Sequence, residues 1–241
     1  MPSGSKIRTA DQHAAKPPRK RREISGAPLK REHIVSTALA LVDRYGLPAL
    51  SMRRLGAELG VDPMAIYYHI PNKQGLLDAI VEAVMAGIDL SLDHRADQPE
   101  ERILCAACAY RDAMLAHVNA LPIVLAHGPA TPVAMRPVEL LIGILRDAGL
   151  PPAQAFAGMQ VLAAAVRGSV GMQPAQGEAK PPGPEQIEAM MRQFPAEEFP
   201  NLIEAMPFAS DFFAHGFEFG VRALARGLLA GQGSGAAGSR G

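Results

Sequence analysis

Five residues in the first third of the chain carry the chemistry needed to contact a nucleic acid. Tyr67, Tyr68 and His69 follow one another in the sequence, and their polar groups can reach phosphates or base edges. Arg53 and Arg54 precede them, and a guanidinium group pairs with guanine or with phosphate. These residue types predict binding to DNA, provided that the chain presents them together on its surface.

Two short helices joined by a tight turn would present these side chains together. Ser51 can cap the first helix with its hydroxyl group, and Gly60 can end that helix. Asp62 can cap the second helix, whose first position suits Pro63. Such a pair forms a helix-turn-helix, in which the second helix enters the major groove of DNA.

The residues expected to contact DNA lie on these two helices and at the start of the next one. Small and apolar side chains can touch thymine methyl groups, and a lysine at a helix N-terminus favours a phosphate. A purely structural bundle over residues 31–75 is the alternative, but aromatic and imidazole rings on an outward face argue against it. The predicted DNA contacts are Ser51, Arg53, Arg54, Pro63, Met64, Ala65, Tyr67, Tyr68, His69 and Lys73.

The rest of the chain is also predicted to be helical. Ile34, Ala38 and Leu41 fall on one face of a helix that Gly46 can end, and Asn72 can cap another helix. Prolines mark the later helix boundaries, and no segment alternates as a strand does. We therefore predict an all-α fold, with an N-terminal helix-turn-helix domain of three helices and a larger helical domain after it.

Charge and composition restrict the partners and the compartment. Residues 1–75 hold 13 Lys and Arg but only 6 Asp and Glu, whereas the remainder is acidic. A basic first third favours a polyanion partner, although a basic arm without a target is possible. No apolar stretch reaches the roughly 18 residues of a membrane span, and no secretory signal is evident. We expect a cytoplasmic protein with no membrane partner.

The helix-turn-helix pattern resembles the tetracycline-repressor family, and within it the tetracycline repressors themselves. Three stretches carry this resemblance: Leu50 to Asp62, Ile66-Tyr67-Tyr68-His69-Ile70, and Asn72 to Asp78. It is strong over about residues 31–85 and weaker beyond them. It implies an all-helical homodimer that is a transcriptional repressor, reads a palindromic operator, and is released from DNA by a small effector.

The resemblance also assigns roles to parts of the chain. It implies base contacts by Arg53, Met64 and Ala65, and phosphate contacts by Ser51, Tyr67 and Lys73.

The expected division is a disordered basic arm (residues 1–28), a DNA-binding domain (29–76), an effector-binding and dimerisation domain (77–230) and a flexible tail (231–241). Small residues between Ala163 and Gly171 and between Ala214 and Gly227 imply two helices of a dimer interface. Close packing within one subunit is the alternative.

An effector cavity is expected between helices of the second domain, with a mainly apolar lining. Tetracycline repressors bind the drug through a histidine late in their fourth helix, and Asp89 stands at the matching position here. The sequence therefore favours an unrelated apolar effector. The methionines and phenylalanine among the candidates could equally be core, and the histidines could be structural. The candidate cavity residues are Met85, Asp89, Met114, His117, His127, Met135, Phe156 and Met159.

Two other classes of protein are the alternatives, a redox enzyme and an architectural DNA-binding protein. Cys105 and Cys108 form a C-x-x-C, but they lie in an expected helix from Ile103 to Leu115, without the strands of a redox enzyme. No second cysteine pair completes a zinc site, so we predict no enzyme, no metal and no cofactor. A DNA-binding protein of architectural type, indifferent to sequence, remains the alternative function.

Overall fold

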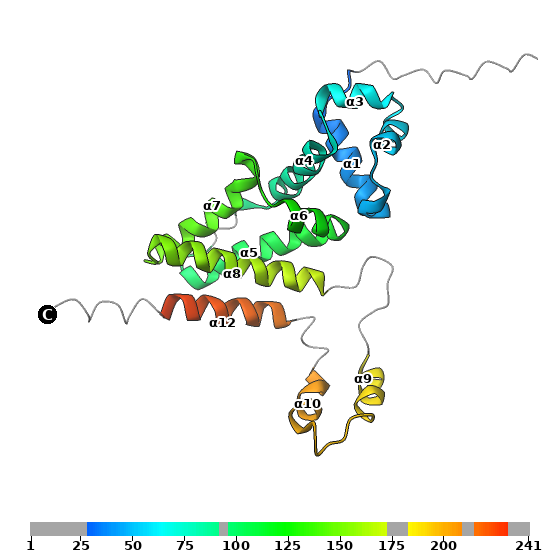
Figure 1. The fold of residues 1–241 in the computed structure, drawn as a ribbon. Helices are drawn as coiled ribbons and strands as arrows, with labels where there is room; N and C mark the ends of the chain where they lie inside the picture. Colours follow the sequence, from blue (N-terminus) through cyan, green and yellow to red (C-terminus); the bar gives the residue numbers. More distant parts are fainter. Residues whose placement is uncertain (1–27, 92–95, 173–182, 209–214, 231–241) are drawn as a thin grey trace, which may run out of the picture.

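The computed structural model describes residues 28–91, 96–172, 183–208 and 215–230, and every regular element in these ranges is a helix. The all-α prediction is confirmed. The predicted basic arm, except residue 28, and the predicted tail lie outside the described residues. Figure 1 shows the elements, which are α1 (Arg31–Tyr45), η1 (Leu47–Ala49), α2 (Met52–Leu59), α3 (Pro63–His69), α4 (Lys73–Ala86), α5 (Pro99–Ala116), η3 (Val118–Ala120), α6 (Leu121–His127), α7 (Pro132–Asp147), α8 (Pro152–Gly171), α9 (Pro184–Met191), α10 (Pro200–Ala205), η4 (Met206–Phe208) and α12 (Phe217–Ala230).

The predicted caps of the first helices are present. The Ser51 hydroxyl oxygen accepts from the Arg54 backbone N–H at 3.2 Å, and the Asp62 carboxylate accepts from the Met64 N–H at 2.8 Å. Asn72 caps α4 in the same way. Each cap satisfies a backbone donor that has no partner within its own helix. The helix boundaries around the recognition motif therefore follow from local chemistry.

The turn between α2 and α3 depends on two glycines. Gly60 ends α2 with φ 69°, a left-handed conformation that glycine adopts without strain. Gly56 is buried where the two helices approach each other. A Cβ atom there would lie 3.0 Å from the Val61 carbonyl oxygen and 3.3 Å from the Pro63 ring. The close approach of α2 and α3 thus requires the absence of a side chain at Gly56.

The N-terminal helices share a core with α4. Ile34, Ala38 and Leu55 are fully buried, together with Ile66 from α3 and Leu76 from α4. The predicted inward face of α1 is confirmed. The same core continues to α5 and α6. Because α4 belongs to both regions, it connects the helix-turn-helix to the rest of the chain.

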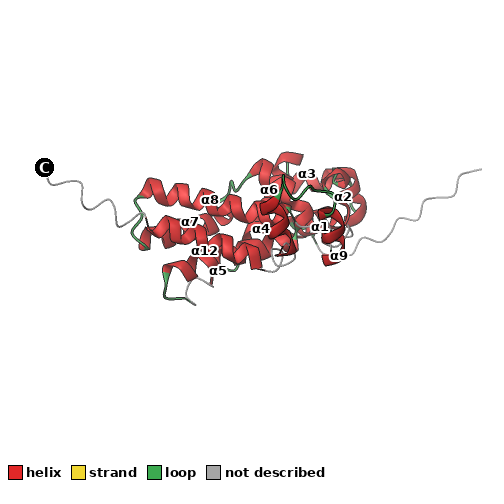
Figure 2. Cartoon of the chain, turned by 90° about the horizontal axis from the view of Figure 1, so that it is seen from below, coloured by secondary structure: helices red, strands yellow, loops and turns green. Residues whose placement is uncertain are grey.

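The second region is a bundle of α5, α7, α8 and α12, which run side by side in Figure 2. Ile103, Ile144 and Leu162 lie in its core, and Gly158 of α8 packs closely on Leu228 of α12. The short elements α9, α10 and η4 lie outside the bundle. Among the described helices, none is long and apolar enough to cross a membrane.

Candidate nucleic-acid interface and ligand cavity

Helix α3 exposes large side chains that do not pack in the core. Ile66 is fully buried and fixes the helix to the core, whereas Tyr68 is 88% exposed and Met64 is 71% exposed. Tyr67 is also exposed, and the ring of half-buried His69 packs edge-on against that of Tyr68 at 5.3 Å. Pro63 and Ala65 are half-buried at the start of the helix. The outward face of α3 is therefore free to contact another molecule.

Cationic side chains flank this face. Arg53 and Lys73 are exposed, on α2 and on the first turn of α4. Arg54 lies over the Tyr45 ring at 4.2 Å, so part of its surface is held against α1. A phosphate near Lys73 would also meet the free N–H groups at the start of α4. Neutral rings with cations on both sides form a surface suited to a DNA groove and its phosphates.

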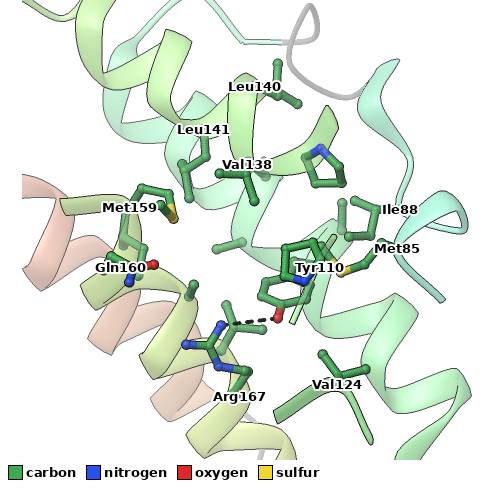
Figure 3. A pocket seen from close by; sticks show the side chains of 18 of the residues that line it. Met85, Ile88, Tyr110, Val124, Val138, Leu140, Leu141, Met159, Gln160 and Arg167 are labelled. Atoms are coloured by element: carbon green, nitrogen blue, oxygen red, sulfur yellow. Dashed lines mark hydrogen bonds between the residues drawn. The ribbon is translucent and has the colours of Figure 1, made fainter. Parts of the chain in front are cut away.

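A cavity of ≈ 240 Å³ lies between α4, α5, α6, α7 and α8. Figure 3 shows its walls, which are mostly methionine, leucine, isoleucine and valine side chains. Among the described residues that line it, the polar side chains are Asp89, Tyr110, Gln160 and Arg167. The Arg167 guanidinium points to the Tyr110 hydroxyl, with 3.5 Å between Nη1 and Oη. Such a cavity suits a mainly apolar ligand with few polar groups.

Of the residues predicted to line the cavity, some do so, and others lie in the core or on the surface. Met85, Asp89 and Met159 line it. Met114 is 1% exposed within the core, because α5 turns it towards the N-terminal helices. Met135 and Phe156 are exposed, and neither lines the cavity, because α7 and α8 direct them outward.

The two predicted histidines join the two regions of the chain and do not line the cavity. The Nδ1 atom of His117 lies 2.8 Å from a carboxylate oxygen of Asp43, which belongs to α1. The Nδ1 atom of His127 lies 2.7 Å from the Gln74 side-chain amide and 3.4 Å from the Asp78 carboxylate, both on α4. Both histidines therefore hold α1 or α4 against the segments that follow α5.

The sequence analysis did not predict three polar residues that line the cavity, which are Tyr110, Gln160 and Arg167. Arg167 had a usable signal, since it is the only charged residue of α8. A lone charge in an apolar helix of 20 residues usually has a specific partner or role. Tyr110 and Gln160 had no such signal, because their position depends on how α5 and α8 pack.

The two cysteines lie on one helix, α5, and are both free thiols. Desolvation by burial is the main cause that raises the pKa of the Cys108 thiol above its ordinary value, and the Glu218 carboxylate adds to it. Reactive cysteines have a lowered pKa, because the thiolate is the nucleophile. The structure therefore gives Cys108 the character of a packing residue.

Comparison with known proteins agrees with this arrangement. Residues 34–80 match the model of bacterial regulatory proteins of the tetR family, and residues 94–231 match the tetracyclin repressor-like C-terminal domain. The chain belongs to the tetracycline-repressor (TetR) family. The resemblance found in the sequence is thus confirmed, and TetR-family members are DNA-binding transcriptional regulators rather than enzymes.

Individual TetR-family relatives extend the match over most of the chain. The class C tetracycline repressor of Escherichia coli is 30% identical over 175 residues, which is 70% of this chain and 77% of that protein. An HTH-type transcriptional regulator of Saccharopolyspora erythraea is 27% identical over 203 residues, which is 84% of this chain and 85% of that protein. The structure of apo ActR from Streptomyces coelicolor superimposes with a TM-score of 0.75 at 31% identity, covering 86% of this chain and 98% of ActR.

Proposed function

We propose that this TetR-family protein is a repressor that binds a palindromic operator as a homodimer and leaves it when a small, largely apolar effector binds. Residues 29–76 would then bind DNA, and residues 77–230 would bind the effector and form the dimer. The single observation that carries the proposal is the exposed face of α3, anchored by buried Ile66 and connected through α4 to a bundle with a cavity.

DNA reading is assigned to the two helices of the motif. Arg53, Met64 and Ala65 would meet base edges, since they lie on α2 and in the first turn of α3. Tyr67 and Lys73 would contact phosphates, as would the Ser51 hydroxyl, whose O–H can still donate while its oxygen caps α2. Phosphate contacts set the register on DNA, and base contacts provide the sequence preference.

Dimerisation is assigned to α8 and α12, which pack against each other within the chain. Each exposes a stripe of small and apolar residues at helical spacing. On α8 and α12 these stripes comprise Ala157, Val161, Ala164, Gly168, Phe219, Ala223 and Gly227. Ideal Cβ atoms at Gly168 and Gly227 would meet no described atom within 4 Å apart from their chain neighbours and the backbone of their own helix. Two such adjacent stripes suit a four-helix interface with a second copy, because small side chains let helices approach closely.

Effector binding is assigned to the cavity between α4 and α8. Met85 and Ile88, at the end of α4 and just after it, line the cavity, while Lys73 lies in the first turn of the same helix. An effector that favours a different position of α4 would change the spacing of the two α3 helices in a dimer. Similar proteins support this role, since ActR of Streptomyces coelicolor has been solved in complex with actinorhodin (TM-score 0.73, 30% identity).

Selection of duplexes from a random library by the full-length protein tests the proposal. We expect enrichment of one palindrome with half-sites about 34–36 Å apart, the separation of one DNA turn. The selected duplex should bind at least about 10³-fold more tightly than random DNA. Equal, strongly salt-dependent affinity for every duplex would instead indicate the architectural DNA-binding protein.

A further inference from the structure

The cavity wall contains a permanent positive charge, the Arg167 guanidinium, whose hydrogen-bond partner among the described residues is a neutral hydroxyl. Arg167 is half-buried on α8 and lines the cavity, and a guanidinium stays protonated at any physiological pH. Its hydrogen-bond partner is the neutral Tyr110 hydroxyl at 3.5 Å, the long limit for such a bond. Within the described residues, no carboxylate lies within ion-pair distance of Arg167. A cation beside apolar walls is stabilised when an anion joins it.

Two other arginines of the bundle, Arg222 and Arg102, are paired with carboxylates. Arg222 lies within ion-pair distance of both Glu100 and Glu101. Arg102 pairs with Asp147 on α7 at 3.2 Å. These arginines join helices of the bundle, whereas Arg167 points into the space that those helices enclose.

The other charged residue of the lining is already engaged. Asp89 accepts hydrogen bonds from the backbone N–H of Ser91 at 2.9 Å and from the Ser91 hydroxyl at 2.6 Å. It follows the end of α4, whereas Arg167 belongs to α8. Asp89 thus accepts two short hydrogen bonds, whereas the positive charge at the α8 wall makes one long hydrogen bond, to Tyr110, among the described residues.

We propose that the effector is an organic acid: an apolar body with one carboxylate or ionised phenol that accepts hydrogen bonds from Arg167 and from the Tyr110 hydroxyl. The inference rests on the proposed function for its regulatory meaning. Apolar walls such as Met85, Leu141 and Met159 would contact the body of the molecule. A charge-assisted hydrogen bond is about twice as strong as a neutral one, so the acidic group would dominate discrimination between similar ligands.

Three naphthalene probes test this assignment by calorimetry on the full-length protein: 2-naphthoate, its isostere 2-naphthamide, and the cation 2-naphthylmethylamine. We expect the acid to bind at least about tenfold more tightly than the amide, and the amine to bind most weakly. Arg167→Gln should abolish this preference while leaving the affinity for the amide within about twofold. Arg167→Lys should retain part of the preference for the acid over the amide, because lysine keeps the positive charge that glutamine removes.

Two further variants complete the experiment. Tyr110→Phe should reduce the preference by a few-fold, because one donor to the acid is lost. Arg136→Gln removes an exposed charge of α7 that does not line the cavity, and it should change nothing. Equal binding of acid and amide to the unmodified protein, or binding of none of the three probes, would overturn the proposal. So would an equal loss of both affinities in Arg167→Gln.

Operator release, measured with the duplex selected above, separates this inference from the proposed function. Tight binding of 2-naphthoate without release of the operator would support the acid-binding site but exclude a regulatory role for it. Release by the amide or the amine, but not by the acid, would keep the repressor function and refute the acidic effector.

Discussion

Tyr67 and Ile66 are neighbours on α3 with opposite surroundings, since Ile66 is buried and Tyr67 is exposed. Tyr67→Ala should therefore leave the fold intact and weaken operator binding by about tenfold, the loss of one good phosphate contact. Fluorescence anisotropy with the selected duplex measures this change. Phe208→Ala provides a control, because Phe208 is an exposed aromatic residue on η4, away from the helix-turn-helix. Unchanged affinity of the Tyr67 variant would mean that another helix reads the DNA.

The surroundings of Cys108 predict a slow reaction of its thiol with alkylating reagents. Because burial raises the pKa of its thiol, less thiolate is present at mildly alkaline pH than in a free thiol. In a Cys105→Ser background, we expect alkylation of Cys108 by iodoacetamide to be at least about tenfold slower than that of N-acetylcysteine. Mass spectrometry follows the reaction, and unfolding in urea should remove the difference. A folded-state rate equal to that of the free thiol would contradict the raised pKa.

Residues with local roles could be predicted from sequence more readily than residues with long-range roles. Ser51, Asp62 and Asn72 were predicted as caps because a cap bonds to backbone two or three residues away. His127 was predicted in the cavity, but the packing of α6 on α4 directs it to Gln74 and Asp78. The helical periodicity of one segment does not specify which neighbouring helix its faces will meet.

At the level of elements, the helix-turn-helix depends on the tight contact of α2 with α3. Gly56→Ala should destabilise the fold by about 1–3 kcal/mol, because the added Cβ would meet the rigid Val61 carbonyl oxygen at 3.0 Å. Gly143→Ala on α7 is the matched control, since no described atom outside its helix lies within 4 Å of the added Cβ. It should stabilise α7 by about 0.4–1 kcal/mol. Urea unfolding measures both, and equal effects would refute the steric argument.

The helices of the motif and the tight turn between them were predicted, but the close contact between the two helices was not. Ile66 and Ile70 are four residues apart, which is helical spacing, and both are buried. The contact of Gly56 with Pro63 left no recognisable signal, because a glycine inside a helix also occurs without any such contact. The cavity depends on five helices meeting, which no local pattern describes.

At the level of the whole molecule, the exposed faces of α8 and α12 predict the assembly state. Phe219 on α12 is 77% exposed and lies in the apolar stripe. Phe219→Asp should convert the proposed dimer to monomers at micromolar concentration, because a carboxylate would be buried in the proposed interface without a partner. Sedimentation velocity measures the change.

Met64→Asp is the matched control for this experiment, since Met64 is 71% exposed but belongs to α3. That variant should remain dimeric and lose operator affinity. A dimeric Phe219→Asp protein would exclude α12 from the interface.

The length of α4 bears on how the protein would respond to small differences between effector molecules. Its 14 residues form a rod of about 21 Å with fully buried Ile80 near the middle. Its buried residues extend from Leu76 to Met85, so the helix moves as one rigid piece and a shift at the cavity wall by Met85 is carried to Lys73 at the other end. In the proposed dimer both α4 helices would shift together, which doubles the change in the spacing of the two α3 helices. Because packed helices shift between discrete arrangements, molecules differing by a single methyl group should give all-or-none, rather than graded, control.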